Sequence, residues 1–361
     1  TDEDEIASAI GKTISEVEAQ GNIKINSAYV TIPGKYVQIV QNSIVKEARD
    51  KFAGITSKDI NSAMLQLRDI DLPDDKVVID LIKNQFILDN GRTVEDPVGA
   101  LSSTVTVTGQ VILADKDYVR QLTSIFKKAN IEIDGIIPNV LAERSLILDV
   151  NEMNDNVMIL DIGAGNTDIG VFNGTNFVYA NTIPLGGDNI TNDIAQVFYI
   201  SEEEADRLKK QYALALKSFI DNDTDIMLTT YKGDERNKVI KSSELIEVIE
   251  ARVEEIFSLV NKQITSLGIK SNINNVILTG QGITCISKSD VAGKIVLNIP
   301  VKIATGRMIS TVKPAYRSSY ALVRYVSSRP YAKNVASKID VKSNENFFKT
   351  ILERIKEFFY T

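Results

Sequence analysis

Residues 156–174, NVMILDIGAGNTDIGVFNG, combine an apolar run, an aspartate and a glycine-rich turn. Gly163 and Gly165 let successive backbone N–H groups face an anion, because no Cβ stands in the way. Thr167 adds a hydroxyl donor, and Asp161 at the end of a buried strand can hold Mg²⁺ through water molecules. The stretch therefore predicts a site for the phosphates of a nucleotide. The alternative is a plain hairpin with an Asx turn.

Two better-known phosphate motifs do not fit this stretch. The dinucleotide-binding fingerprint G-x-G-x-x-G needs a third glycine where Asp168 stands, and it needs a helix afterwards. The residues that follow, DIGVFNG, indicate a strand instead. A Walker loop requires Gly-Lys-Ser/Thr, which is absent here. The pattern that remains is strand, acid, glycine turn and strand.

Two further glycine turns favour a nucleotide site over the plain hairpin. In PLGGDNIT, Gly186 and Gly187 precede an expected helix, whose N-terminus is a suitable place for a phosphate. In LTGQGI, a turn of Gly280, Gln281 and Gly282 follows an expected strand. Because glycine permits close backbone contact, this turn can lie against an adenine ring.

Composition limits the possible classes of protein. The chain has 361 residues, 43% apolar and 25% charged, which is typical of a soluble globular protein with at least two domains. A net charge of -7 argues against broad nucleic-acid binding. The absence of histidine excludes His-dependent catalysis and His-ligated metals. One cysteine, Cys285, excludes an internal disulfide, fits a reducing cytosolic compartment, and is expected to be a small buried hydrophobe.

Strands and helices alternate along the chain, which indicates an α/β fold. Ser57 is the expected N-cap of one helix, and Ser201 with Glu204 forms a capping box for another. We expect strands at 25–33, 36–45, 77–82, 85–89, 102–113, 131–137, on both sides of the 161–167 turn, at 177–184 and from 274. Helices are expected at 3–20, 57–70, 116–129, after Pro138 to about 149, at 188–198, after Ser201 and at 243–267.

The C-terminal region has two parts with different patterns. Residues 327–346 are polar with little periodicity, which is typical of a linker. Residues 347–361 predict an amphipathic helix with a charge of +1 on its polar side. An interfacial helix at an anionic membrane surface is favoured over a helix packed on the protein's own core. The residues expected at the membrane are Phe347, Phe348, Ile351, Leu352, Ile355, Phe358 and Phe359.

The motifs LDIGAGNTDIGVF, IPLGGDNITNDIA, EEADRLKKQYA and VILTGQGIT, in this order, resemble the actin/Hsp70/sugar-kinase ATPases and, within them, the FtsA family of bacterial division proteins. This resemblance implies an actin-like, two-lobed α/β fold with an inserted subdomain 1C. The family's first phosphate hairpin has no match, so its N-terminal strands are expected to be missing here. The implied divisions are 1–45 (part of subdomain 1A), 46–132 (1C), 133–155 (return to 1A), 156–209 (2A), 210–274 (2B), 275–326 (closure of 2A and 1A), 327–346 (linker) and 347–361 (membrane helix).

The resemblance also implies ATP and Mg²⁺ as ligands. Asp206 replaces the glutamate of a ribose-contacting motif, and Lys209 is retained. Asn139 replaces a glutamate that positions the attacking water in several relatives, so ATP binding is expected with weak hydrolysis or none. The implied binding residues are Asp161 (also the metal-side acid), Gly163, Ala164, Gly165, Asn166, Thr167, Gly186, Gly187, Asp206, Lys209, Gly280, Gln281 and Gly282.

The implied partners follow from the same resemblance. They are the C-terminal peptide of FtsZ at 210–274, further copies of the chain through 46–132 and the lobes, anionic inner-membrane lipids, and other division proteins. The implied location is the cytoplasmic face of the cell membrane at the division septum, and no nucleic acid is expected. A type IV pilus assembly ATPase-like protein and a small-molecule kinase on the same fold are the alternatives.

Overall fold

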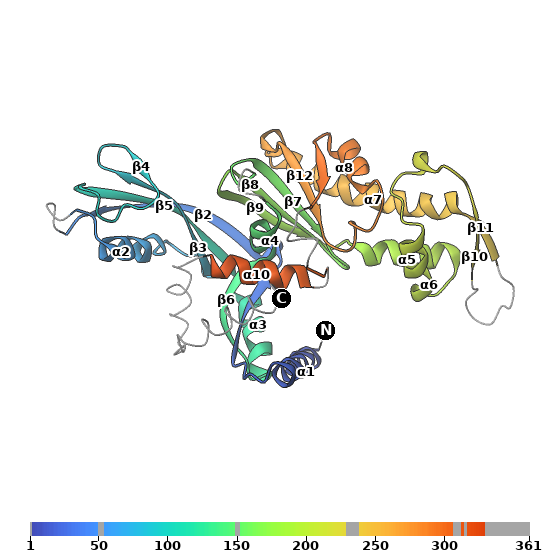
Figure 1. Cartoon of the computed structure of the whole chain (residues 1–361), viewed down its shortest axis with the longest axis horizontal. Coiled ribbons are helices and arrows are strands. Elements are labelled where there is room, and N and C mark those ends of the chain that lie inside the picture. The colour runs from blue at the N-terminus through green and yellow to red at the C-terminus, as the bar shows by residue number, and fades with distance from the viewer. Residues whose placement is uncertain are drawn as a thin grey trace.

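The computed structural model describes residues 2–49, 54–148, 152–228, 238–305, 312–313 and 316–328. Figure 1 shows an elongated molecule with two sheets side by side and a group of helices beyond the second sheet. The predicted membrane helix at 347–361 and all but the first two residues of the predicted linker lie outside the described residues. In the part of the chain that the structure describes, no helix is long and apolar enough to cross a membrane.

The central sheet has five strands in the order β13-β12-β7-β8-β9. β7, β8 and β9 form an antiparallel meander, while β12 and β13 run parallel to β7. The apolar run before Asp161 is continuous because both faces of β7 are covered. The bounds are β7 (Asn156–Ile162), β8 (Thr167–Asn173), β9 (Asn176–Ile183), β12 (Asn275–Thr279) and β13 (Val301–Ile303).

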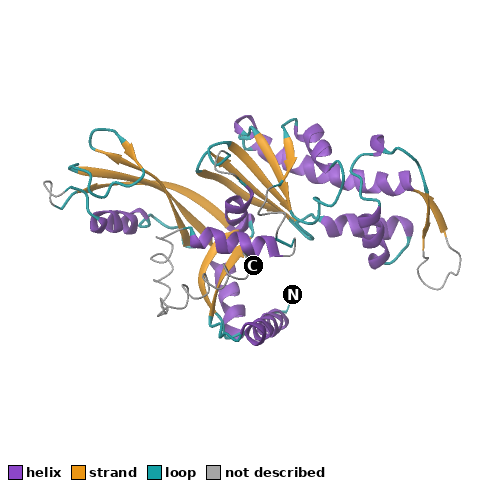
Figure 2. Cartoon of the chain, in the orientation of Figure 1, coloured by secondary structure: helices purple, strands orange, loops and turns teal. Residues whose placement is uncertain are grey.

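Helices cover both faces of this sheet. Met158 and Leu160 belong to a buried cluster shared with α5 and α7, whereas Val157 and Ile159 pack with α4 and α10 on the other face. Figure 2 shows that α5, α6, α7 and α8 lie together at one end of the molecule, whereas α4 and α10 lie near its middle. The bounds are α4 (Asn139–Ile147), α5 (Gly187–Phe198), α6 (Glu202–Gln211), α7 (Ser242–Ser266), α8 (Ser289–Leu297) and α10 (Arg317–Ser327).

A second, antiparallel sheet of four strands has the order β2-β5-β3-β4, and α2 packs against it. Residues 77–82 and 85–89 were expected to form two strands, but they form one strand whose register shifts at Val78/Asp80 and Lys83/Gln85. The bulges let the strand bend while it keeps pairing with β5. The bounds are β2 (Val37–Glu47), α2 (Ser57–Leu67), β3 (Lys76–Leu88), β4 (Thr93–Val94) and β5 (Thr104–Asp115).

Smaller units complete the described fold. β1 and β6 pair in parallel, and α1 and α3 pack against each other beside them. β10 and β11 form an antiparallel pair beyond the helices. The bounds are α1 (Glu3–Gly21), β1 (Ser27–Ile32), η1 (Gly34–Tyr36), α3 (Lys116–Lys128), β6 (Glu132–Pro138), η2 (Lys217–Phe219), β10 (Asp225–Leu228), β11 (Lys238–Lys241) and η3 (Lys270–Asn272).

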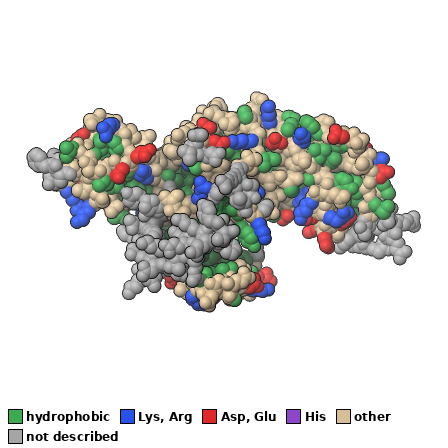
Figure 3. All heavy atoms as spheres, viewed as in Figure 1, with side chains coloured by type: hydrophobic (Ala, Val, Ile, Leu, Met, Phe, Trp, Pro, Cys, Tyr) green, Lys and Arg blue, Asp and Glu red, His purple; other side chains and the backbone are tan. Residues whose placement is uncertain are grey.

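Two further local predictions are wrong. The N-cap of α2 is Thr56 rather than Ser57, because the Thr56 hydroxyl accepts from the Asp59 N–H while Asp59 accepts in return from the Thr56 N–H. Cys285 is exposed rather than buried. It follows the glycine turn at 280–282 on the outward side, and its thiol donates to the Gln281 carbonyl at 3.3 Å. On the face shown in Figure 3, basic and acidic side chains are interspersed.

Candidate nucleotide site

The three predicted glycine turns meet at the carboxyl end of β7. The Gly282 N–H donates to the Ile162 carbonyl at 2.8 Å, which joins the turn after β12 to the turn after β7. The Gly187 N–H donates to the Gly163 carbonyl at 2.9 Å, and the Asp188 N–H donates to the Ala164 carbonyl at 2.8 Å. Segments more than a hundred residues apart in sequence therefore form one structure.

Glycine is required where these turns touch. A Cβ on Gly282 would lie 2.1 Å from the Gly163 oxygen, and one on Gly186 would lie 2.4 Å from the Ala164 oxygen. Gly280 has φ +87°, and its Cβ would lie 2.3 Å from the Ile162 oxygen. A Cβ on Gly165, in contrast, would meet nothing within 4 Å. The turns are therefore packed backbone to backbone on one side, while the turn at 163–166 has an open outer side.

The open side of the β7–β8 turn carries Ala164, Gly165 and Asn166, which are all exposed. Thr167, predicted as a phosphate contact, is fully buried, and its hydroxyl donates to the Leu185 carbonyl at 2.8 Å. Thr167 thus ties the turn to the segment before α5. Gln281 is exposed at the top of its turn, as a residue that faces a ligand must be.

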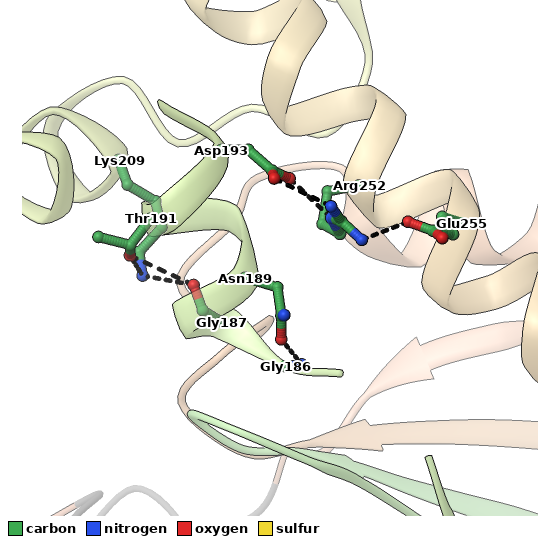
Figure 4. Close-up of polar contacts among 8 residues, drawn as sticks. All are labelled: Gly186, Gly187, Asn189, Thr191, Asp193, Lys209, Arg252 and Glu255. Carbon is green, nitrogen blue, oxygen red and sulfur yellow. Dashed lines mark hydrogen bonds and ion pairs between the residues drawn. The ribbon is translucent and has the colours of Figure 1, made fainter. Parts of the chain in front are cut away.

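The N-terminus of α5 is held by two side chains (Figure 4). The Lys209 ammonium is buried and donates to the Gly187 carbonyl at 3.0 Å and the Thr191 hydroxyl at 2.6 Å. Asn189 accepts from the Gly186 N–H at 2.8 Å. Lys209, predicted as a ribose contact, instead uses its donors to fix the turn from which α5 begins.

Asp206 lies at the outer end of the same network. It pairs with Lys209 at 3.1 Å and Lys210 at 2.5 Å, and it lines an open depression of about 490 Å³ with Ser201, Glu203, Glu204, Arg207 and Lys210. Burial and hydrogen bonding have opposite effects on its carboxyl, and the bond from Lys210 dominates, so the pKa of Asp206 is lowered. Asp206 is therefore the exposed member of the predicted ribose pair.

α5 is also fixed to α7. Arg252 of α7 donates two hydrogen bonds to the Asp193 carboxylate, at 2.6 and 2.9 Å, and contacts Glu255 on its own helix (Figure 4). A bidentate arginine–carboxylate pair sets orientation as well as distance. α5 is thus held at its N-terminus by Lys209 and near its middle by Arg252.

Three acidic groups gather beneath the turns. Asp161 and Asp168 are directly opposite each other in the β7–β8 pair. The Asn139 amide, at the start of α4, donates to Asp161 at 2.7 Å and to Asp168 at 3.4 Å. Glu143 is one helical turn further along α4, is 4% exposed, and accepts from the Ser318 hydroxyl at 3.1 Å.

Burial and mutual repulsion disfavour the charged forms of these acids. Burial, followed by the Asp168 carboxylate, raises the pKa of Asp161 to about 6. Burial also raises the pKa of Asp168, against the effect of its hydrogen bonds. The pKa of Glu143 is raised well above its ordinary value by burial and then by the Asp161 carboxylate. The three groups therefore hold their protons more tightly than free carboxyl groups do, because charging all of them in this buried region is costly.

This charge distribution fits a cation bound near Asp161. Among the described residues no ion pair forms with these three acids, although the Lys35 ammonium acts on Asp168 from a distance, so a bound cation would relieve their repulsion. Among the described residues, no group of three or more His, Cys, Asp or Glu is arranged to ligate a metal directly. Contact through water, which Mg²⁺ retains readily, is the mode that we expect for a magnesium ion near Asp161.

Sequence reasoning left Asp168, Glu143 and Thr182 out of the predicted site. The sequence analysis noted Asp168 only because it stands where the dinucleotide fingerprint needs a glycine. Its position opposite Asp161 nevertheless follows from the register of a tight hairpin. Glu143 is four residues after Asn139, a spacing that places both side chains on one helical face. Thr182, which donates to Asp168, gave no comparable signal.

The fold and the site together define an actin-like protein with two lobes and an inserted domain. A sequence model described as "Cell division protein FtsA" matches residues 158–321, and one described as "SHS2 domain inserted in FTSA" matches residues 34–113. The second match covers β2, α2, β3, β4 and most of β5.

Individual relatives agree with these matches. Cell division protein FtsA of Bacillus subtilis (strain 168) is 30% identical over 324 residues, covering 90% of this chain and 73% of that protein. Cell division protein FtsA of Escherichia coli (strain K12) is 23% identical over 339 residues, covering 90% and 79%. The chain belongs to the FtsA family of cell division proteins.

A solved structure supports the fold independently. The PilM–PilN type IV pilus biogenesis complex includes a chain that superposes with a TM-score of 0.56 at 14% identity, covering 91% of this chain and 86% of that one. At this identity the likeness shows the fold alone. The predicted actin-like architecture with an FtsA-type insertion is thus confirmed.

Proposed function

We propose that this chain binds Mg-ATP at the three glycine turns, assembles with further copies of itself, and links FtsZ polymers to the cytoplasmic membrane at the division septum. The observation that carries the nucleotide part is the contact of three distant glycine turns around Asp161. Family membership supports the division role. It does not favour a pilus-assembly protein or a small-molecule kinase.

Different residues would hold different parts of the nucleotide. The open side of the turn at 163–166 offers backbone N–H groups to phosphates. Asp161 would hold the water molecules around Mg²⁺, which neutralises phosphate charge when bound. Gln281 and Asp206, both accessible, face the adenosine. Lys209 positions α5 instead of contacting the ligand.

The geometry supports binding more than hydrolysis. Asn139 occupies the position next to Asp161, and its amide already donates to both carboxylates of the hairpin. An amide cannot accept a proton from water, so Asn139 cannot act as a general base. We propose that hydrolysis is weak or absent, and that the bound nucleotide serves mainly to stabilise one conformation.

Exposed apolar side chains support self-assembly and partner binding. Leu101 is 80% exposed and Val45 is 65% exposed in the inserted domain, which we propose as a contact with the next copy. Met227 and Val239 are cross-strand partners in β10 and β11, and both are exposed. The surrounding region, 210–274, is our proposed binding region for the FtsZ C-terminal peptide.

Membrane attachment rests on the sequence pattern of residues 347–361. A single short amphipathic helix binds reversibly, and several copies in a polymer would add avidity. The expected lipids are anionic, because the polar side of the helix carries a charge of +1. Attachment would therefore depend on the assembly state, and other division proteins would join the assembled form.

Two experiments test the proposal. Calorimetry with Mg-ATP should show binding. If no heat of binding is measured at millimolar Mg-ATP, the nucleotide part of the proposal is wrong. Flotation with phosphatidylglycerol-containing vesicles should carry the whole chain but not a chain that ends at residue 345. Neutral phosphatidylcholine vesicles are the matched control. Equal flotation of the two chains contradicts the membrane part.

A further inference from the structure

We propose that Asp168 and Thr182 form a latch through which the inserted domain and the candidate nucleotide site compete for one carboxylate. The inference rests on the proposed function for its ligand, Mg-ATP. Its physical basis is a junction between η1, the turn that leads into β2, and the β8–β9 hairpin. This junction is fully described in the structure.

The turn is bound through its backbone. The Gly34 N–H donates to Asp168 Oδ1 at 3.3 Å, and the Lys35 N–H donates to Thr182 Oγ1 at 3.0 Å. The Thr182 hydroxyl in turn donates to Asp168 Oδ1. The backbone N–H groups of Gly34 and Lys35 are therefore both hydrogen-bonded to this buried pair, the first to Asp168 and the second to Thr182. Buried polar groups are costly to leave unpaired, so the contact fixes the turn.

Close packing reinforces the junction. A Cβ on Gly34 would lie 2.7 Å from both the backbone N and O of Asn181, although the φ of Gly34 is in the ordinary range. The glycine is thus needed for close approach to β9 rather than for backbone freedom.

The inserted domain contacts the same strand at its other end. Gln110 of β5 is 0% exposed; its amide donates to the Phe177 carbonyl at 2.6 Å and accepts from the Phe177 N–H at 2.9 Å. Asn84 of β3 donates to Asn176 at 2.6 Å. β9 is therefore contacted by the second sheet at Asn176 and Phe177, at its start, and by the η1 turn that leads into that sheet at Thr182, near its end.

The latch is coupled to the candidate site through the other Asp168 oxygen. Oδ1 accepts from the turn and Thr182, while Oδ2 accepts from Asn139, which also holds Asp161. A cation near Asp161 attracts the Asp168 carboxylate directly across the hairpin. That attraction draws Asp168 away from Gly34 and Thr182. Cation binding and docking of the turn therefore oppose each other, and the coupling is reciprocal.

The first test follows amide hydrogen exchange in the whole chain. Millimolar Mg-ATP should speed exchange in the segment 33–37, and Thr182→Val should do the same without any ligand. Thr106→Val, the same change at a half-buried position on β5, is the control and should leave 33–37 unchanged. Unchanged exchange at 33–37 in Thr182→Val shows that the latch is absent.

The second test measures affinity. Because docking and binding oppose each other, Thr182→Val should bind Mg-ATP about five- to tenfold more tightly than the parent chain. Gly34→Ala, which breaks the junction sterically without touching Asp168, should act in the same direction if it folds. Equal or weaker binding by a folded Thr182→Val overturns the latch.

The two proposals fail separately. If calorimetry shows that the parent chain binds Mg-ATP, but neither exchange at 33–37 nor the affinity of Thr182→Val changes, the latch is wrong and the nucleotide site stands. If the chain does not bind Mg-ATP, the proposed nucleotide site is wrong. The latch is then tested by amide hydrogen exchange at 33–37 in the presence of Mg²⁺ without nucleotide. Faster exchange at 33–37 with the metal supports it, and unchanged exchange rejects it.

Discussion

Asp161 and Asp168 face each other across the β7–β8 hairpin, and the single amide of Asn139 donates to both carboxylates. Two acids on adjacent strands repel each other, so the hairpin is stabilised by whatever neutral donor or cation lies between them. The glycine turn therefore has structural contacts in addition to its proposed role in binding phosphate. It connects the candidate site to α4 on one side and to the inserted domain on the other.

Asn139→Asp should test that relationship. The change replaces the donor with a fourth carboxylate, so the free energy of unfolding in EDTA should fall by about 1–3 kcal/mol. Millimolar Mg²⁺ should recover part of the loss, because a cation neutralises the cluster. Chemical denaturation with and without Mg²⁺ measures both effects. A variant that is as stable as the parent in EDTA would show that the Asn139 bonds contribute little.

The pH dependence of stability has a defined sign. The pKa of Asp161 rises from its ordinary value of 3.8 to about 6 in the folded chain, so the folded state holds the proton more tightly than the unfolded state. Stability is then highest at low pH in this window and falls as pH rises from 3.8 through about 6, by roughly 3 kcal/mol for this group. The raised pKa of Glu143 acts in the same direction.

Asp161→Asn and Glu143→Gln should each flatten this decline. The measurement is urea denaturation between pH 4 and pH 7.5 in EDTA. Glu18→Gln is a suitable control, because the pKa of that half-buried glutamate is lowered, not raised. A decline as steep in both site variants as in the parent would assign the pH dependence to other groups.

The glycine turns offer a matched pair of substitutions. Gly282→Ala places a methyl group 2.1 Å from the Gly163 oxygen, so the free energy of unfolding should fall by about 1–3 kcal/mol. Gly165→Ala meets open space and should leave stability within about 0.5 kcal/mol of the parent. Thermal unfolding distinguishes the two. Equal melting temperatures would mean that the turns do not pack backbone to backbone.

A buried hydrogen bond joins α10 to the inserted domain. The Tyr325 hydroxyl donates to the Asp80 carboxylate at 2.5 Å, across 245 residues of sequence. Tyr325→Phe removes this donor and should lower stability by about 1–3 kcal/mol. Tyr316→Phe, at a side chain 61% exposed, is the control and should have almost no effect. Equal effects of the two changes would argue against a specific role for the Tyr325–Asp80 bond.

Much of the local structure could be predicted from the sequence. Spacing predicted the long helix ended by Gly268, and the apolar run before Asp161 predicted a buried strand. These signals are local, because periodicity reports which side of an element is covered. The failures at Thr56 and Cys285 are also local, since neighbouring residues compete for the same cap and a lone cysteine carries no periodic pattern.

The sequence by itself determined that three glycine turns follow strands or precede a helix, and that an acid lies near the end of β7. Only the tertiary structure decided that the turns at Gly282, Gly187 and Gly163 contact one another. It also decided that Lys209 donates to the N-terminus of α5 and that Asp168 accepts from the Gly34 N–H. The physical reason is that side-chain types and spacing restrict short-range conformation, whereas a hydrogen-bond partner 134 residues away is selected only when the sheets pack.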